Sequence, residues 1–248
     1  MSQRNIKLIL AYEGTRYLGW QKTIAGPSIE EELEKAAAQI LRHRVNLQAA
    51  SRTDSGVHAE GQVVNFFTER DIPLDKLQKG LNSLLPSDIS VLKIEEAPET
   101  FHPTLQNVGK EYHYFVCLGS TQLPFYRNFS WHFIYPINSE EMKKAAAHLI
   151  GKHDFSALTN EKQEDNVREI FDIAIEVLDG RLKIRVSGNN FLYKMVRNIV
   201  GTLLYVGCGK LSAEQIPAVI KSKDRTLAGV TAPAHGLVLK EVFYDRKK

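Results

Sequence analysis

The stretch Arg52-Thr53-Asp54-Ser55-Gly56-Val57-His58-Ala59 places one carboxylate, between a cation and a glycine, at a break between two strand-like segments. Before it, apolar residues of 45–49 alternate with polar ones, and after it residues 62–67 are apolar and β-prone, which predicts a loop between two strands. Loops held by a rigid sheet often carry catalytic groups. Asp, Ser and Gly are also ordinary turn residues, so a plain turn bent at Gly56 stays open as the alternative.

Upstream and downstream of this loop, the first half of the chain alternates between strands and helices. Strands are expected near 6–12, 45–49, 62–67 and 89–94, and helices from Ser28 and near 74–84. Ser28 with Glu31 three residues later has the signature of a capping box. The resulting β-α-β-β-α-β order is the split pattern of a ferredoxin-like or RNA-recognition-type sheet.

The second half loosely repeats this alternation. Strands are expected near 110–116, 167–178, 182–187 and 236–244, and helices near 139–150, 191–206 and 212–221. Ser139 is the expected cap of its helix, and Asp179-Gly180 predicts a hairpin turn. We therefore predict an α+β fold of two related ferredoxin- or RRM-like halves, residues 1–104 and 105–248. They would form a continuous, mostly antiparallel mixed sheet flanked by helices, with the catalytic cleft between them.

The composition is that of a soluble globular protein with a real core. The 248 residues are 43% hydrophobic, and 32 Lys and Arg against 29 Asp and Glu leave a net charge of +3, too mild to diagnose nucleic-acid binding. The start of the chain lacks the apolar core of a signal peptide, and the most apolar helix contains Lys194 and Arg197, so no membrane span is expected. Cys117 and Cys208 are far apart and fit free thiols in a reducing compartment. We expect a cytoplasmic protein.

Several common catalytic patterns are absent from the sequence. There is no Gly-rich phosphate loop, no H-E-x-x-H or comparable metal-ligand spacing, and no Gly-x-Ser-x-Gly elbow. We therefore expect no metal site, and we interpret His58 and His102 as structural or surface residues. The carboxylate of the opening stretch is left as the best catalytic candidate.

Asp54 could do covalent or base chemistry if a cation keeps it ionised and a pocket excludes water. Arg52 would leave the chain on the same side as Asp54 if strand geometry persists. Arg197 lies in a helix that is apolar almost all round, where a buried Arg needs a carboxylate partner; an Arg reaching solvent is the alternative. Tyr112 and Tyr114 share one strand face, where a Tyr can stack on a base or pack in the core.

Six motifs, in order and covering almost the whole chain, resemble those of the tRNA pseudouridine synthase A family. Residues 52–59 resemble its G-R-T-D-A-G-V-H-A signature. The other five are, in chain order, Tyr12-Glu13-Gly14 with Gly19-Trp20-Gln21, Lys110-x-Tyr112-x-Tyr114, Gly151 to Ser156, Phe191 to Arg197 with Gly201, and Pro233 to Leu237.

The resemblance implies a role for each candidate residue. Asp54 would be the catalytic aspartate and Arg197 its ion-pair partner. Arg52 would help displace the target uridine, Tyr112 would stack on the flipped uracil, and Leu237 would pack in the same pocket. The family isomerises uridines at positions thirty-eight to forty, in the anticodon arm of tRNA, as homodimers without a cofactor.

The residues leave the chemical route open. Asp54 could attack C1′, attack C6, or remove the C2′ proton, and all three routes need an ionised carboxylate. Ser51, Ser55 and Thr104 depart from the family pattern, which usually has Gly, Ala and often Arg at these places. A hydrolase that frees the base and a non-catalytic RNA-binding module are the alternative functions.

Overall fold

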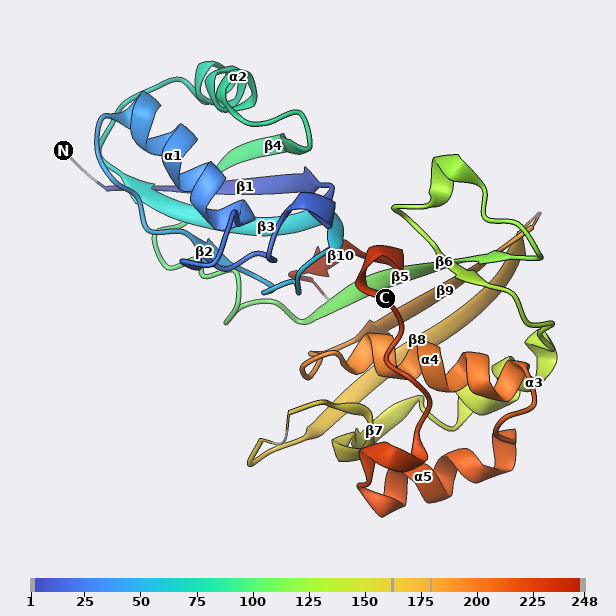
Figure 1. Cartoon of the computed structure of the whole chain (residues 1–248). Helices are drawn as coiled ribbons and strands as arrows, with labels where there is room; N and C mark the ends of the chain where they lie inside the picture. Colours follow the sequence, from blue (N-terminus) through green and yellow to red (C-terminus); the bar gives the residue numbers. More distant parts are fainter. Residues whose placement is uncertain (1–2, 162, 179, 246–248) are drawn as a thin grey trace. The chain divides into compact units, whose positions relative to one another are not determined.

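The computed structural model describes residues 3–161, 163–178 and 180–245 (Figure 1). The chain divides into two compact units. One contains the residues up to Val108 together with those from Leu239 onward, and the other contains Gly109–Val238. Each unit has its own core.

The first unit is a small sheet covered by two helices (Figure 1). Its strands are β1 (Arg4–Tyr12), β2 (Gln48–Ala49), β3 (His58–Thr68), β4 (Ile89–Ala97) and most of β10 (Leu237–Phe243). β1 pairs with β3 and β4, and β2 pairs with β3. Helices α1 (Ile29–Leu41) and α2 (Leu74–Leu84) contact each other beside this sheet (Figure 1). Every second residue of β1 is fully or almost fully buried, and these are Ile6, Leu8, Leu10 and Tyr12.

The second unit combines a mixed sheet with three helices. β5 (Gly109–Leu118), β9 (Arg181–Gly188), β8 (Val167–Leu178) and β7 (Gly151–Asp154) follow one another antiparallel, and β6 (Trp131–Phe133) pairs with β5 in parallel. Helices α3 (Ser139–Ala147) and α4 (Met195–Gly207) pack on each other, and α3 also contacts β8. α5 (Ile216–Ser222) lies near β7 (Figure 1).

The α+β class and the mixed sheet with flanking helices are confirmed. The predicted cap of α1 is present, because the Ser28 hydroxyl accepts from the Glu31 amide. β8 and β9 form the predicted hairpin, although Asp179 of its turn lies outside the described residues. The relation of the two halves to a ferredoxin-like fold, and the joining of their sheets, stay predictions.

Two helix starts were predicted wrongly. α4 begins at Met195 and not at Phe191, because the side chains of Asn189 and Asn190 hydrogen-bond nearby amides and Lys194 adopts a left-handed φ of 58°. These contacts satisfy the backbone without a helix. α3 is capped by Asn138 and not by Ser139, and it ends at Ala147. The strand expected over 45–49 is reduced to the two residues of β2.

The corrected cap of α3 gives the first prediction. Asn138 Oδ1 accepts from the amides of Glu140 and Glu141, at 3.0 and 3.2 Å. Asn138→Ala leaves both amides without this acceptor and should lower the free energy of unfolding by about 1 kcal/mol. Urea denaturation followed by circular dichroism measures the loss. Ser139→Ala is the matched control with little expected change, and a larger loss from this control would return the cap to Ser139.

Candidate functional site

The loop that carries Asp54 leaves β2 at Ala49 and enters β3 at His58. One buried side chain of β3 bonds to both backbone groups of Ser51, two residues after the end of β2. The Gln62 amide nitrogen donates to the Ser51 carbonyl at 2.6 Å, and the Gln62 carbonyl oxygen accepts from the Ser51 amide at 3.2 Å. Gln62 is fully buried, so the entry to the loop is fixed from the sheet.

Thr53, directly before Asp54, is held from two sides. Its hydroxyl shares a 2.8 Å hydrogen bond with the Tyr12 hydroxyl at the end of β1. Its carbonyl accepts from the Trp20 amide at 3.0 Å. Thr53 is buried, while Asp54 is half-buried. The carboxylate therefore follows a residue whose side chain and backbone are both fixed.

The turn after Asp54 has the form that the plain-turn interpretation predicts. The Val57 amide donates to the Asp54 carbonyl at 3.1 Å, and Gly56 adopts a φ of 78°. The Ser55 hydroxyl and the Gly56 amide both donate to the Tyr17 carbonyl, at 3.2 and 3.3 Å. The serine that departs from the family pattern thus ties the turn to the preceding segment.

His58 closes the loop as a structural residue. It is buried, and its Nδ1 accepts from the Gly14 amide at 3.0 Å. Gly14 lies so close that a Cβ there would overlap the Val57 carbonyl. The motif of residues 12–14 and 19–21 therefore packs against the Asp54 loop and supports it. Sequence reasoning missed this support, for which the glycines at 14 and 19 were the available signal.

Arg52 and Asp54 do not follow strand alternation. β2 ends at Ala49, and residues 51–54 have no regular secondary structure. The prediction that both side chains leave the chain on the same side required strand geometry, and this stretch is not a strand. Arg52 is exposed, and Asp54 is half-buried. Thr104, another departure from the family pattern, donates its hydroxyl to the Ala49 carbonyl at 2.7 Å.

In the second unit, the two tyrosines of β5 are both buried on one face, as predicted. The Tyr112 ring meets the Phe191 ring edge to face, with centroids 5.3 Å apart. The Tyr114 hydroxyl donates to the Pro233 carbonyl at 2.8 Å, and burial raises its pKa. Tyr114 is thus a core residue, which was one of the two interpretations.

Arg197 is half-buried in the first turn of α4, within a helix that is buried almost all round, as predicted. Its Nε donates to the Ala232 carbonyl at 2.7 Å, and its own carbonyl accepts from the Ala232 amide at 3.1 Å. Leu237 is buried at the start of β10. Its neighbour Gly236 packs directly against the Tyr114 ring. Arg52 and Asp54 therefore lie in one unit, and Tyr112, Arg197 and Leu237 in the other.

Lys110 opens the Lys110-x-Tyr112-x-Tyr114 motif and has no role in the predicted site. Only 6% of it is exposed, and its ammonium donates to the Asn190 side-chain oxygen at 3.1 Å. Burial lowers the pKa of Lys110 to about 8. Lys110 and Tyr112 both contact the Asn190-Phe191 pair from the same face of β5.

Comparison with known proteins assigns the chain. The family described as tRNA pseudouridine synthase matches residues 8–104 and 145–245, which is most of the sequence. The chain belongs to this family. tRNA pseudouridine synthase A 2 of Protochlamydia amoebophila is 55% identical over 98% of this chain and 95% of its own length. The tRNA pseudouridine synthase A proteins of Thermoanaerobacter sp. (strain X514) and Bacillus subtilis are 44% and 42% identical over 97% of this chain, and 100% and 99% of their own lengths.

The resemblance seen in the six motifs is therefore confirmed. The chain is an enzyme of the tRNA pseudouridine synthase class, an isomerase that converts uridine in tRNA to pseudouridine. This sets aside the base-freeing hydrolase and the non-catalytic RNA-binding module. Of the helices in the described parts of the chain, none is long and apolar enough to cross a membrane.

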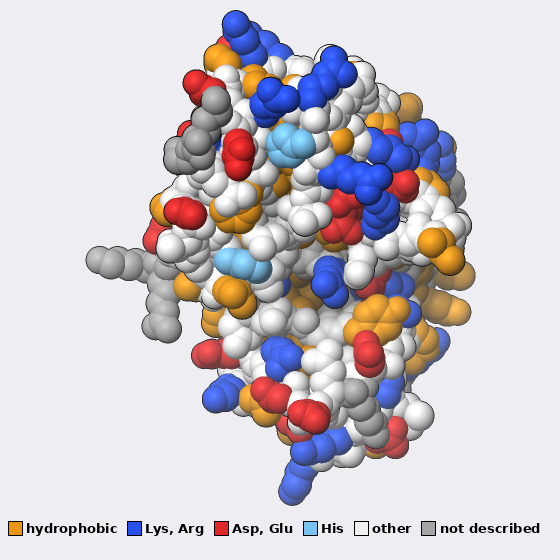
Figure 2. Space-filling view, turned by 90° about the vertical axis from the view of Figure 1, so that its left-hand side faces the viewer, with side chains coloured by type: hydrophobic (Ala, Val, Ile, Leu, Met, Phe, Trp, Pro, Cys, Tyr) orange, Lys and Arg blue, Asp and Glu red, His pale blue; other side chains and the backbone are white. Residues whose placement is uncertain are grey.

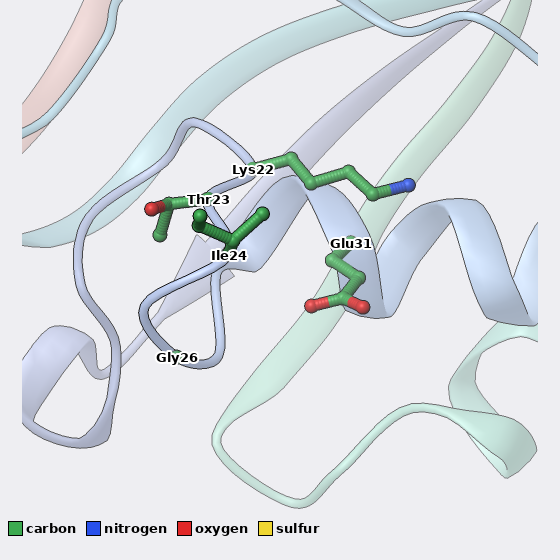
Figure 3. Close-up of a pocket in the computed structure, with 5 residues that line it drawn as sticks. All are labelled: Lys22, Thr23, Ile24, Gly26 and Glu31. Carbon is green, nitrogen blue, oxygen red and sulfur yellow. The ribbon is translucent and has the colours of Figure 1, made fainter.

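This tRNA pseudouridine synthase has a hollow of about 510 Å³ whose lining contains no residue of the Asp54 loop (Figure 3). It is lined by Lys22, Thr23, Ile24, Gly26 and Glu31, from the loop before α1 and from α1 itself. None of these residues has a role in the predicted site. Within residues 3–161, 163–178 and 180–245, no three His, Cys, Asp or Glu side chains gather as metal ligands.

Lys110 gives a prediction about stability and pH. Its pKa is about 8 in the folded protein against 10.5 ordinarily, so the unfolded chain binds more protons between these values. Stability should therefore gain a contribution as pH rises from 8 towards 10.5, up to about 1.4 kcal/mol per pKa unit. Lys110→Met should lose this contribution and be more stable than the parent at pH 7, because it buries no charge.

Thermal unfolding at a series of pH values from 7 to 10 measures this effect. The exposed Lys79→Met on α2 is the control and should keep the parent pH dependence. Identical pH dependence in Lys110→Met and the parent would contradict the assignment to Lys110.

Proposed function

We propose that this enzyme isomerises uridines at positions thirty-eight, thirty-nine or forty, or several of them, in the anticodon stem-loop of tRNA. The observation that carries the proposal is the Asp54 loop, in which one half-buried carboxylate is held by fixed neighbours on both sides. A catalytic group needs its geometry fixed before the substrate arrives. No comparable support would be needed for a surface turn.

Asp54 is the essential aspartate of this proposal, acting as nucleophile or base on a flipped-out uridine. Arg197 is its ion-pair partner and keeps the carboxylate ionised. Support for the Arg197 role comes from its Nε, whose hydrogen bond to the Ala232 carbonyl orients the guanidinium. The bond from the Ala232 amide to the Arg197 carbonyl holds the two backbones together. The attack on C1′, the attack on C6 and the removal of the C2′ proton all start from this ionised carboxylate.

Three further residues act on the base. Tyr112 stacks on the extruded uracil, Leu237 packs in the same pocket, and Arg52 helps displace the uridine from the stack. Arg52 is exposed, as a residue that meets RNA must be, and Leu237 is held by the contact of Gly236 with Tyr114. Extruding a base costs a few kcal/mol, least where stacking is already weak, which favours a target near a loop.

The proposed enzyme works in the cytoplasm as a homodimer on the anticodon arm, without a cofactor. The N-terminal part carries the aspartate loop, and the C-terminal part carries the stacking tyrosine and the partner arginine. Exposed apolar side chains on residues 123–135 support a self-association surface, with Phe125 exposed to 90%. On the face in Figure 2, Lys and Arg side chains lie among Asp and Glu. Contacts with tRNA phosphates on this face would therefore come from individual basic side chains and not from one continuous basic surface.

Asp54→Asn tests the mechanism. It keeps the shape of the side chain and removes the charge, so it should bind tRNA like the parent and lose activity. Release of tritium from C5-labelled uridine in anticodon-arm tRNA is the measurement. Ser55→Ala, in the same turn, is the matched control and should stay active. Tritium release by Asp54→Asn at the parent rate would contradict the catalytic role of Asp54.

The salt dependence of binding tests the polyanionic substrate. Phosphate contacts release counterions, so the logarithm of tRNA affinity should fall linearly with the logarithm of salt concentration. Filter binding of Asp54→Asn with intact tRNA measures binding without turnover. A flat response between about 50 and 200 mM salt would argue against phosphate-mediated tRNA binding.

A further inference from the structure

Residues 229–232 run along one face of α4, and their backbone is held by side chains of that helix. The Gly229 amide donates to the Thr202 hydroxyl at 3.0 Å, and the Ala232 carbonyl accepts from Arg197 Nε at 2.7 Å. Between these ends, a Cβ at Gly201 would overlap the Val230 carbonyl. Arg197 and Gly201 are one turn apart, so they present one helix face to the segment.

Arg225 bonds to the same segment and to α4. Its Nη1 donates to the Gly229 carbonyl at 2.7 Å, and its Nη2 donates to Thr231 Oγ1 at 3.0 Å and Asn198 Oδ1 at 2.8 Å. Thr231 in turn donates to Asn198 Oδ1 at 2.7 Å. The guanidinium, the hydroxyl and the amide thus form a closed triangle.

The partners of Arg225 in the described residues are neutral oxygens, and burial lowers its pKa. Its Nε is buried without a hydrogen bond. A cation held in this way is costly to bury. The rigid fork of the guanidinium, which reaches three acceptors at once, is what this arrangement uses.

Asn198 connects this triangle to the helix residue beside it. It is fully buried, and its Nδ2 donates to the Leu158 carbonyl at 2.9 Å and Asn160 Oδ1 at 2.8 Å. Its neighbour in the chain is Arg197. The triangle and the Ala232 contact therefore fix the same turn of α4 and the segment against which the Arg197 side chain lies.

We propose that Arg225, through Asn198 and Thr231, is a positioning residue for Arg197 in the isomerisation. It sets the place of the Ala232 carbonyl, and that carbonyl sets the plane of the Arg197 guanidinium. This inference rests on the proposed role of Arg197 in catalysis. Misplacement of a catalytic contact by about 1 Å can cost a hundredfold in rate.

Arg225→Lys is the first test, because it keeps the charge but cannot reach three acceptors in one plane. We expect single-turnover pseudouridine formation to slow by about tenfold to a hundredfold. Affinity for tRNA should stay within about twofold, because the change acts on the chemical step. Arg168→Lys is the matched control and should keep parent activity. It also donates to backbone carbonyls and carries a buried, unbonded Nε, on β8.

The second test is a double-mutant cycle with Arg197→Lys. If Arg225 acts through Arg197, adding Arg225→Lys to Arg197→Lys should slow the reaction little further. If the double variant is slowed by the product of the two single rate losses, the two residues act independently and the positioning role is overturned. A loss confined to tRNA affinity would also overturn it, and both outcomes leave Arg197 catalytic. A parent-like rate for Arg197→Lys alone would overturn this inference, because lysine keeps the charge but has no guanidinium plane to set. A parent-like rate for Arg197→Met, which removes the charge, would overturn the catalytic role of Arg197 as well.

Thr231→Val keeps the inference testable if Arg225→Lys does not fold. It removes one hydroxyl of the triangle and should slow the reaction in the same direction, again only when Arg197 is intact. Thr226→Val is its control, because the Thr226 hydroxyl donates to Asp224 outside the triangle. Parent-like turnover by a folded Thr231→Val would count against the triangle.

Discussion

Close packing of backbone against backbone, where no Cβ fits, is the constraint on which both parts of the candidate site depend. In the first unit, Gly14 lies against the Val57 carbonyl and supports the turn after Asp54. In the second, Gly201 lies against the Val230 carbonyl and brings α4 onto residues 229–232. A side chain at either place would force the loop or the segment to move. Such a contact contains no side chain that could change rotamer, so it restricts movement of the neighbouring backbone.

Hydrogen bonds to neutral partners surround these close contacts. Around Asp54 they come from Tyr12, Gln62 and the Trp20 amide, and around Arg197 from Ala232, Asn198 and Thr231. Buried networks of this kind define one geometry, because breaking any bond leaves a desolvated polar group. Exposed ion pairs on the helices, such as Lys35 with Glu31, contribute little by comparison. The buried hydrogen bonds therefore fix side-chain position at both parts of the candidate site.

Local patterns predicted the elements well, and non-local contacts explain what they missed. The predicted bounds of α2 match the observed Leu74–Leu84. The four residues from Ser28 to Glu31 were enough to predict the cap of α1. The start of α4 was missed because Asn189 and Asn190 bond to the backbone instead of continuing a helix. The support of the Asp54 loop by Tyr12 and Gly14 spans more than forty residues, so no periodicity reports it. The motifs identified the family, but they did not show which of their residues hold others in place.

The Lys-x-Tyr-x-Tyr spacing shows why a motif can mix these two kinds of residue. Its three named positions alternate along β5, so all of them share one face. Tyr114 uses this face to bond the Pro233 carbonyl, and with Gly236 against its ring it sets where Leu237 begins β10. Lys110 and Tyr112 meet the Asn190-Phe191 pair instead. One strand face thus carries the proposed stacking ring and also anchors the segment that holds Arg197, so a change in the twist of β5 would move both together.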